Sequence, residues 1–166
     1  MKFFKSKTFY FLSIILLALF CKLFVIDVLY ISGSSMEPTL ISGSFILVNK
    51  LSWGVPVPYK NKYWVRWGEP HSENIVIYPW LDRYVIKRCV GTAGTQLVFS
   101  EKTGYSVDIG NRHIPLTEEQ YKKLSTCTAI PSGMIFTLGD NVKESRDSRD
   151  YGFVSVDSIR GKVLWK

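Results

Sequence analysis

Residues 9–26 read FYFLSIILLALFCKLFVI, and this apolar segment divides the chain into two unlike parts. Its first thirteen residues carry no charge, and Lys22 is the only charged residue among all eighteen. A membrane-spanning helix needs roughly 20 apolar residues, and a lysine near its end can extend its ammonium group to the lipid headgroups. We therefore expect one transmembrane helix that runs from about Tyr10 to Phe24 or Ile26.

The charges that flank this segment predict its orientation. Lys2, Lys5 and Lys7 precede it, so the positive-inside rule places the amino end in the cytoplasm and the body outside the cytoplasmic (inner) membrane. A cleaved secretory signal shares this basic head, and a buried helix of a soluble protein is a further alternative. Cleavage requires small residues after the apolar run, but bulky side chains follow until Ser32 and Gly33. This pattern favours an uncleaved anchor.

The composition bounds what the rest of the chain can be. With 166 residues, 46% of them apolar and 21% charged, there is room for one modest folded domain beside the anchor. The net charge is +7, of which +3 lies in the first 27 residues. Because the remainder is only mildly basic, we expect a lipid bilayer as a partner and no nucleic acid. Three cysteines and two histidines predict no metal site, and we expect no cofactor.

Beyond the anchor, short runs rich in Val, Ile, Phe and Tyr alternate with turn residues, which is typical of β-strands. One short helix is expected at 117–124, where Thr117 and Gln120 can form a capping box. We therefore predict a mostly β fold, with residues 1–26 as basic head and transmembrane anchor and residues 27–166 as an extracytoplasmic, β-rich catalytic domain. The oligomeric state stays open. The expected strands are 44–51, 74–78, 83–90, 96–100, 105–109, 134–138 and the final KVLWK.

The segment WGVPVPYKNKYWVRWGEPH at 53–71 holds three of the five tryptophans and three prolines. One interpretation is a surface excursion whose aromatic side chains pack on the body. The other is a lip that dips into the membrane interface, where tryptophan and tyrosine are favoured. The sequence leaves both open.

Two side chains are candidates for hydrolytic chemistry. Ser35 lies in the turn YISGSSMEPTL at 30–40, and Lys87 lies in the otherwise apolar run YVIKRCV. A buried lysine loses its proton more readily, and so can act as the base that a histidine usually supplies. His71 follows a proline in the aromatic segment, and His113 has no acidic neighbour in sequence, so we interpret both as surface residues.

Together these pieces resemble the type I signal peptidases, which are membrane-anchored Ser–Lys proteases. The resemblance runs through four motifs in the family's order, from the anchor to the carboxyl end. A nucleophile motif is similar to S-M-x-P-T-L, a core strand follows, and then come a general-base motif similar to Y-I-K-R-V-V-G and a final G-D-N-x-x-x-S-x-D-S-R motif. The matching segments are SMEPTL at 35–40, NIVIY at 74–78, YVIKRCVG at 84–91 and GDNVKESRDSR at 139–149.

The resemblance implies a role for each matching residue. Ser35 would be the nucleophile and Lys87 the general base, and Ser145 would orient the Lys87 amine through a hydrogen bond. Asp147 and Arg149 would form a supporting ion pair.

The sequence departs from the family pattern at several positions. Gly33 stands where some members carry a serine that helps to bind the oxyanion. Glu73-Asn74 replaces Gly-Asp, Val142-Lys143 replaces Arg-Asp, and the loop GTAGT at 91–95 differs from G-x-P-G-D. None of these changes removes a reacting group.

The resemblance also implies the substrates: signal-peptide-bearing preproteins, bound as an added strand and cut after a small-x-small site. The expected pocket walls are Leu29, Ile31, Met36 and Ile86. Alternatives are a dedicated Ser–Lys maturation protease for one secretion or conjugation substrate, and a catalytically silent, membrane-anchored binding module. Strand alternation places Cys89 on the face of Lys87, and a Cys89–Cys127 disulfide is left open.

Overall fold

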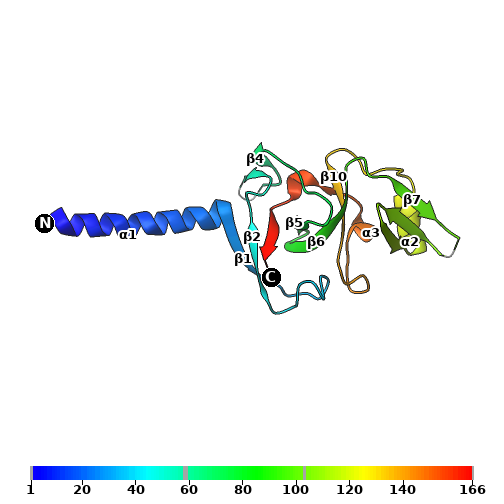
Figure 1. The fold of residues 1–166 in the computed structure, drawn as a ribbon, viewed down its shortest axis with the longest axis horizontal. Coiled ribbons are helices and arrows are strands. Elements are labelled where there is room, and N and C mark those ends of the chain that lie inside the picture. Colours follow the sequence, from blue (N-terminus) through cyan, green and yellow to red (C-terminus); the bar gives the residue numbers. More distant parts are fainter. Residues whose placement is uncertain (1, 58–59, 103, 166) are drawn as a thin grey trace.

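One long helix leads into an antiparallel β body (Figure 1). The computed structural model describes residues 2–57, 60–102 and 104–165. Helix α1 (Lys2–Phe20) continues into one π-helical turn, η1 (Cys21–Val25). The apolar span within them is Lys7–Val25, and none of its residues is buried in the protein. A helix that is apolar on all sides needs an apolar surrounding, so this length and composition suit a bilayer.

The body is built on a seven-stranded sheet in the order β1-β2-β12-β5-β6-β10-β11. All neighbouring pairs in it are antiparallel. The first strand begins at the residue that follows the anchor, so the anchor enters the sheet at its edge. The strands are β1 (Ile26–Tyr30), β2 (Phe45–Asn49), β5 (Ile75–Trp80), β6 (Arg83–Thr92), β10 (Met134–Leu138), β11 (Val154–Ser155) and β12 (Gly161–Trp165).

Alternation along β5 and β6 sends side chains into two separate cores. Val76 pairs with Lys87, and Ile77 pairs with Ile86, so the two pairs lie on opposite faces of the sheet. The face of Val76 carries one apolar cluster, together with Tyr78, Cys89 and Ile159 among others. The face of Ile77 carries the other, with Ile31, Met36, Leu40, Ile46 and Val48. Lys87 is therefore a basic residue on an apolar face.

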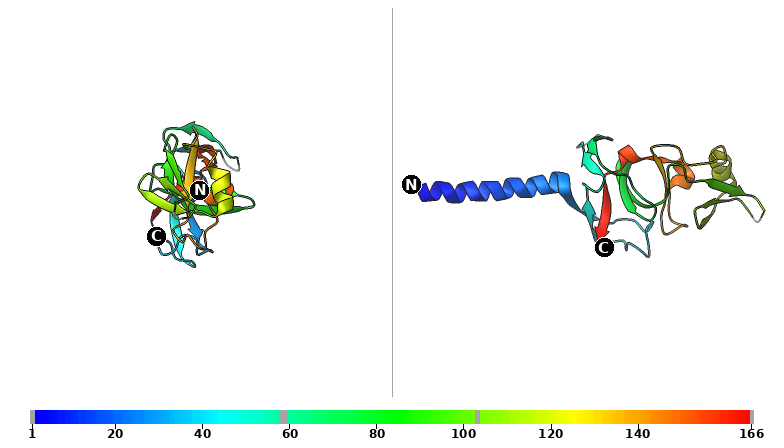
Figure 2. Two further views of the ribbon diagram at one scale, coloured as in Figure 1. Left: turned by 90° about the vertical axis from the view of Figure 1, so that its right-hand side faces the viewer. Right: turned by 45° about the horizontal axis from the view of Figure 1, so that its top comes forward.

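Two smaller sheets flank the main one. The hairpin of β3 (Gly54–Pro56) and β4 (Tyr63–Arg66) lies beside the carboxyl end of the anchor (Figure 1). The three-stranded sheet lies with helix α2 at the end of the molecule remote from the anchor (Figure 2). The elements of this remote end are β7 (Leu97–Ser100), β8 (Ser106–Ile109), β9 (Arg112–Pro115) and α2 (Glu118–Leu124).

The mostly β fold with one amino-terminal helix is confirmed, and all seven expected strands are present within a few residues. The expected capping box is also confirmed, because Thr117 accepts from Gln120 N and Gln120 accepts from Thr117 N. Several short elements were not expected from the sequence. They are β1, β3, β4, β9, β11, the four-residue helix α3 (Ser148–Tyr151) and the 3₁₀ turn η2 (Val156–Ser158).

Candidate active site

Ser35 lies on a tight turn in the connection between β1 and β2. The turn is closed by hydrogen bonds from Glu37 N to Ser34 O (3.0 Å) and from Leu40 N to Met36 O (2.9 Å). Met36 and Leu40 are almost fully buried, and they pack the turn against the face of the sheet that carries Ile77. The Ser35 hydroxyl is thus held on a rigid, packed turn.

Lys87 projects from the middle of β6 and reaches that hydroxyl. Its Nζ donates a hydrogen bond of 2.6 Å to Ser35 Oγ, although the two residues are 52 positions apart in sequence. Lys87 is only 3% exposed. Burial is the main cause that lowers the pKa of Lys87 below its ordinary 10.5; Asp147 and Asp140 oppose this effect, and Arg149 adds to it.

The segment from Gly139 onward holds the turn of Ser35 from the other side. Asn141 N donates to Ser35 O (3.0 Å), and Asn141 Nδ2 donates to Ser34 O (3.2 Å). Gly139 lies between the two serines of the site: a Cβ there would come within 2.5 Å of Ser35 O and of Ser145 Cβ. Glycine is required at 139 because the backbones approach so closely.

Asp147 organises the end of this segment. It is fully buried, and its carboxylate accepts from Ser145 Oγ (2.7 Å), Gly139 N (3.0 Å) and Arg149 Nε (2.9 Å). Arg149 also donates to Val142 O (2.9 Å) and Ser145 O (3.1 Å). The expected ion pair of Asp147 and Arg149 is present, and Asp147 also caps helix α3.

The structure corrects the expectation that Ser145 is hydrogen-bonded to Lys87. Among the hydrogen bonds of the described residues, the Lys87 amine donates to Ser35 and the Ser145 hydroxyl donates to Asp147. The physical reason is that a carboxylate two residues away is a stronger acceptor for the hydroxyl proton than an amine. Ser145 is therefore tied to the ion pair of Asp147 and Arg149.

Arg88, for which no catalytic role was expected, links β6 to the same segment. Its Nε and Nη2 donate to the two carboxylate oxygens of Asp140 at 2.8 and 2.6 Å. Burial disfavours the charge on Asp140, but hydrogen bonds from Arg88 and Thr39 outweigh it, so the pKa of Asp140 lies below its usual range. This bidentate pair fixes the final motif against the strand that carries Lys87.

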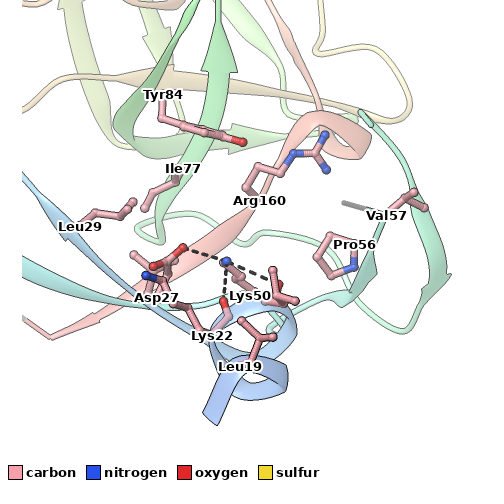
Figure 3. Close-up of a pocket in the computed structure, with 12 residues that line it drawn as sticks. Leu19, Lys22, Asp27, Leu29, Lys50, Pro56, Val57, Ile77, Tyr84 and Arg160 are labelled. Atoms are coloured by element: carbon pink, nitrogen blue, oxygen red, sulfur yellow. Dashed lines mark hydrogen bonds and ion pairs between the residues drawn. The ribbon is translucent and has the colours of Figure 1, made fainter. Parts of the chain in front are cut away.

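The four expected pocket walls come together in one apolar cluster on the face of Ile77. Ile31 and Met36 are buried in it, and Leu29 and Ile86 pack against it as partly buried members. A separate cavity of about 420 Å³ lies nearer the anchor. It shares Leu29 with these walls, and Figure 3 shows it between the anchor, the β3–β4 hairpin and the main sheet.

The side chains of the histidines and cysteines form no hydrogen bond with Ser35 or Lys87 among the described residues, although Cys89 packs in the cluster on the same face of the sheet as Lys87. His71 is exposed. His113 has an acidic partner that the sequence interpretation missed, because β8 and β9 pair it with Asp108, where Nδ1 lies 2.6 Å from Oδ1. Both members of this pair are exposed. Cys89 and Cys127 are free, and burial raises the pKa of the Cys89 thiol to about 12.

Four residues of the site were not assigned a role from the sequence: Arg88, Gly139, Asp140 and Asn141. Their signal was present, because three of them form the Gly-Asp-Asn opening of the final motif and Arg88 follows the lysine directly. The sequence did not show which residue each of them contacts in the folded chain. Arg88 and Asp140 are 52 positions apart in sequence, and Asn141 is 107 positions from Ser34.

The chain has a helix of membrane-spanning length joined to an antiparallel body. The body carries a serine hydroxyl that is hydrogen-bonded to a desolvated lysine. These features define the class of membrane-anchored proteins with a hydrolase-like site. The family model described as "Signal peptidase, peptidase S26" matches residues 5–166, so the chain belongs to this family. The family makes it a serine endopeptidase with signal peptidase I function.

Individual relatives agree with the family. Signal peptidase I of Bacillus caldolyticus is 30% identical over 86% of this chain and 79% of its own length. Signal peptidase I of Pseudomonas fluorescens is 27% identical over 93% of this chain and 69% of its own length. A crystal structure of a signal peptidase I from Enterococcus faecalis V583 aligns over 58% of this chain and 97% of its own, with 26% identity and a TM-score of 0.42.

Proposed function

We propose that Ser35 and Lys87 are the nucleophile and general base with which this chain cleaves signal peptides from preproteins after a small-x-small site. The observation that carries the proposal is the 2.6 Å hydrogen bond between a buried lysine amine and a serine hydroxyl on a rigid turn. A nucleophile and a base within hydrogen-bond reach are the minimum requirement for acyl transfer. The reaction needs no cofactor.

The proton moves between these two groups in each half of the reaction. Neutral Lys87 takes the Ser35 proton as Oγ attacks the scissile carbonyl, and it then gives that proton to the leaving amine. In the second half, Lys87 takes a proton from the water that attacks the acyl-enzyme, and it returns this proton to Ser35 Oγ as the C–O bond to Ser35 breaks. The apolar surroundings of Lys87 favour the neutral amine that each half requires.

The Ser35 backbone N–H is the proposed oxyanion donor. Among the hydrogen bonds of the described residues, none uses this N–H as a donor, so it is available to a developing negative charge. Gly33 adds no side-chain donor, and a Cβ at this position would meet no atom within 4 Å. The oxyanion site therefore relies on the backbone, with open space beside it.

Three further residues have proposed orienting roles. Asp147 and Arg149 hold the final motif in its folded form, and Ser145 acts through Asp147 rather than through Lys87. The negative charge of Asp147 also limits how far the pKa of Lys87 falls, which keeps the amine basic enough to accept a proton.

For the substrate, Leu29, Ile31, Met36 and Ile86 are the proposed pocket walls. They belong to one apolar cluster, in which Ile31 and Met36 are almost fully buried and Leu29 and Ile86 are partly exposed. Shallow apolar pockets accept small side chains, while backbone pairing along a strand supplies most of the affinity. This accounts for small residues one and three positions before the cut.

The bilayer places enzyme and substrate together. We propose residues 1–26 as cytoplasmic head and anchor of a single-pass protein of the cytoplasmic membrane, and residues 27–166 as an extracytoplasmic catalytic domain. The lysines before the span support this orientation, because cytoplasmic flanks carry the excess of positive charge. Confinement to one membrane surface raises the effective concentration of a membrane-inserted preprotein.

The test uses the full chain reconstituted in lipid, with a set of unrelated preproteins. Wild type should release mature protein after a small-x-small site, and Ser35→Ala should abolish cleavage, while the neighbouring Ser34→Ala retains it. Cleavage that survives in folded Ser35→Ala would refute the proposed nucleophile. Cleavage of one preprotein only would replace the general peptidase by a dedicated maturation protease of the same chemistry.

A further inference from the structure

The cavity of about 420 Å³ near the anchor continues the apolar cluster that contains the proposed pocket walls. Leu29, Val48 and Ile77 line the cavity, and all three also belong to that cluster. Tyr84 of β6 lines it too, two residues before the wall residue Ile86 and therefore on the same face of the strand. The cavity and the proposed walls are thus parts of one surface, which extends from Ile86 past Tyr84 toward the anchor.

The anchor and the hairpin segment complete the lining of this cavity. Leu19 comes from the anchor, and Pro56 and Val57 lie across the cavity from Leu29 and Ile77, as Figure 3 shows. The volume falls within the range of about 300–1,000 Å³ that is usual for ligand pockets. The cavity is therefore large enough for a side chain such as that of leucine or methionine.

Arg160 brings an unused hydrogen-bond donor to the lining of the cavity. Its Nη2 donates to Lys60 O and to Asn61 Oδ1, which fixes the guanidinium group. Its Nη1 is enclosed and has no hydrogen-bond partner among the residues that the structure describes. A buried donor without an acceptor is costly, and a ligand that brings a carbonyl oxygen to Nη1 would remove this cost.

The charged groups that line the cavity have a positive balance. Lys22, Lys50 and Arg160 lie there with one carboxylate, that of Asp27, which forms an ion pair with Lys50 at 2.8 Å. Like charges repel, and they do so more strongly where water is partly excluded. The cavity therefore disfavours a basic side chain and accepts a neutral, apolar one.

We propose that this cavity is a subsite of the peptidase and that it receives the substrate side chain five positions before the cut. Side chains of an extended strand alternate between two faces, so the residues one, three and five positions before the cut share a face. The fifth lies about 7 Å beyond the third, toward the membrane-inserted part of the preprotein. The cavity continues the surface of the proposed walls in this direction. The inference rests on the proposed function and adds a determinant of specificity to it.

This subsite selects a different class of side chain from the two small pockets. Its volume and apolar lining favour a large, uncharged side chain at the fifth position. Arg160 is the proposed specificity-determining residue. Its charge opposes a lysine or arginine of the substrate, and its Nη1 donates to a backbone carbonyl of the bound chain.

The test is cleavage by the full chain, reconstituted in lipid, of preproteins that differ only at the fifth position before the cut. That position carries Ala, Met or Lys, and the comparison of Met with Lys isolates the charge because the two side chains have similar length. We expect kcat/KM to be about tenfold higher for Met than for Ala, since burial of extra apolar groups gives discrimination of this size. We also expect Met to be preferred to Lys.

Arg160→Met separates the role of the charge from a general effect on the fold. We expect the ratio of kcat/KM for Met over Lys to fall about threefold, because one repelling charge is removed. A loosened fold would lower both values and leave their ratio unchanged. Arg83→Met is the matched control, because Arg83 is exposed and adjoins Tyr84 in β6 but does not line the cavity. It should keep the wild-type ratio.

A binding measurement decides the question if Arg160→Met does not fold. Photo-leucine at the fifth position of a preprotein bound to Ser35→Ala should crosslink to the lining of the cavity, at Ile77, Val57 or Leu19. Mass spectrometry of the crosslinked peptides identifies the site. A crosslink to phospholipid instead would place this side chain in the bilayer and overturn the proposal.

The outcome for the subsite is distinguishable from the outcome for the peptidase. Equal kcat/KM values for Ala, Met and Lys in wild type would refute the subsite, while cleavage after a small-x-small site would still support the proposed function. If wild type cuts none of the series, the proposed function fails and the subsite fails with it.

Discussion

Lys87 experiences two opposed influences on its charge. Removing its ammonium group from water disfavours the charged form, and the nearby carboxylates of Asp147 and Asp140 favour it. Burial is the larger of these, so the pKa of Lys87 is lowered. The folded state thereby maintains a base that the unfolded chain would not have.

Replacing Lys87 by Met should separate activity from stability. We expect kcat to fall by about 10²–10⁴, the usual contribution of a general base. The pKa of Lys87 is lower in the folded state than in the unfolded state, so between these two pKa values the unfolded chain binds more protons. The buried ammonium group therefore destabilises the folded state most at a pH below the folded pKa. Lys87→Met should therefore raise Tm at neutral pH, by roughly 2–4 °C if the gain is about 1 kcal/mol.

The measurement is a thermal unfolding series against pH, in one detergent. The gain in Tm should shrink as the pH rises toward 10.5, because wild type then carries no penalty in either state. A lower Tm for Lys87→Met at neutral pH would mean that the amine stabilises the fold as a charged group.

Single residues show what the sequence can and cannot predict. Ser35 and Lys87 were identified because each lies in a local pattern of its own. The partner expected for Ser145 was wrong, since the choice between Lys87 and Asp147 depends on distances within the folded loop. Asn141 was quoted in the final motif but given no role, because its partners Ser34 and Ser35 are more than a hundred residues away.

Among the elements, the segment from Gly139 to helix α3 is the one that assembles the site. It contacts the turn of Ser35 through Asn141, contacts β6 through the pair of Arg88 and Asp140, and closes on itself around Asp147. Each of these links joins polar groups in a mostly buried region, where an unpaired group is costly.

Gly139→Ala should displace the nucleophile. The added Cβ would come within 2.5 Å of Ser35 O, and backbone at this position cannot yield cheaply. A shift of about 1 Å in a reacting group can lower the rate about 10²-fold, so we expect a fall in kcat of this order with the fold retained. Gly33→Ala is the matched control, because its Cβ meets no atom within 4 Å. Equal activities of the two variants in a peptide-cleavage assay would contradict this account.

Asp147→Asn should destabilise the segment. The change leaves Arg149, whose side chain is 7% exposed, as a buried charge without its partner. Breaking such a pair costs about 3–5 kcal/mol, which unfolding in denaturant can measure. Adding Arg149→Met to Asp147→Asn should restore part of the lost free energy of unfolding, because it removes the unpaired buried charge. Asp108→Asn, in the exposed pair with His113, should change stability little. A similar loss in both single variants would argue against the buried pair.

Element prediction succeeded where a run rich in Val, Ile and Tyr stands between turn residues. Strands β5 and β6 are of this kind, whereas β1 was not predicted because no turn residue separates it from the apolar run of the anchor. The hairpin of β3 and β4 was hidden by its prolines and charges, and its pairing became visible only through the register of Gly54 with Arg66. Trp53 from this segment packs in the core, as one interpretation held, while Trp64 and Trp67 face outward.

At the scale of the whole molecule, Lys50 fastens the anchor to the body. Its Nζ forms an ion pair with Asp27 (2.8 Å) and donates to Lys22 O (2.9 Å) at the carboxyl end of the helix, as Figure 3 shows. A cation at this end also suits the helix dipole. The anchor is therefore tied through Lys50 to the end of β2, in addition to its direct continuation into β1.

Lys50→Met should affect membrane-inserted substrates selectively. A partly exposed pair of this kind is worth about 0.2–1 kcal/mol, so we expect at most about a fivefold loss in cleavage of a membrane-inserted preprotein. Hydrolysis of a short soluble peptide should be unchanged, because the partners of the Lys50 amine are Asp27 and the carbonyls of Lys22 and Leu23 rather than Ser35 or Lys87. Lys122→Met, which removes an exposed pair with Glu118 at the far end of the body, is the control. Equal losses on both substrates would show that Lys50 supports the site itself.

The central claim is that Lys87 is a neutral base at the pH where the enzyme works. Direct titration of its side chain by ¹³C NMR of labelled lysine, with the signal assigned by its loss in Lys87→Met, tests this. We predict that Lys87 titrates below its ordinary 10.5, and that the same pKa governs the acid limb of kcat/KM. A Lys87 ammonium that stays protonated throughout the pH range of full activity would contradict the account.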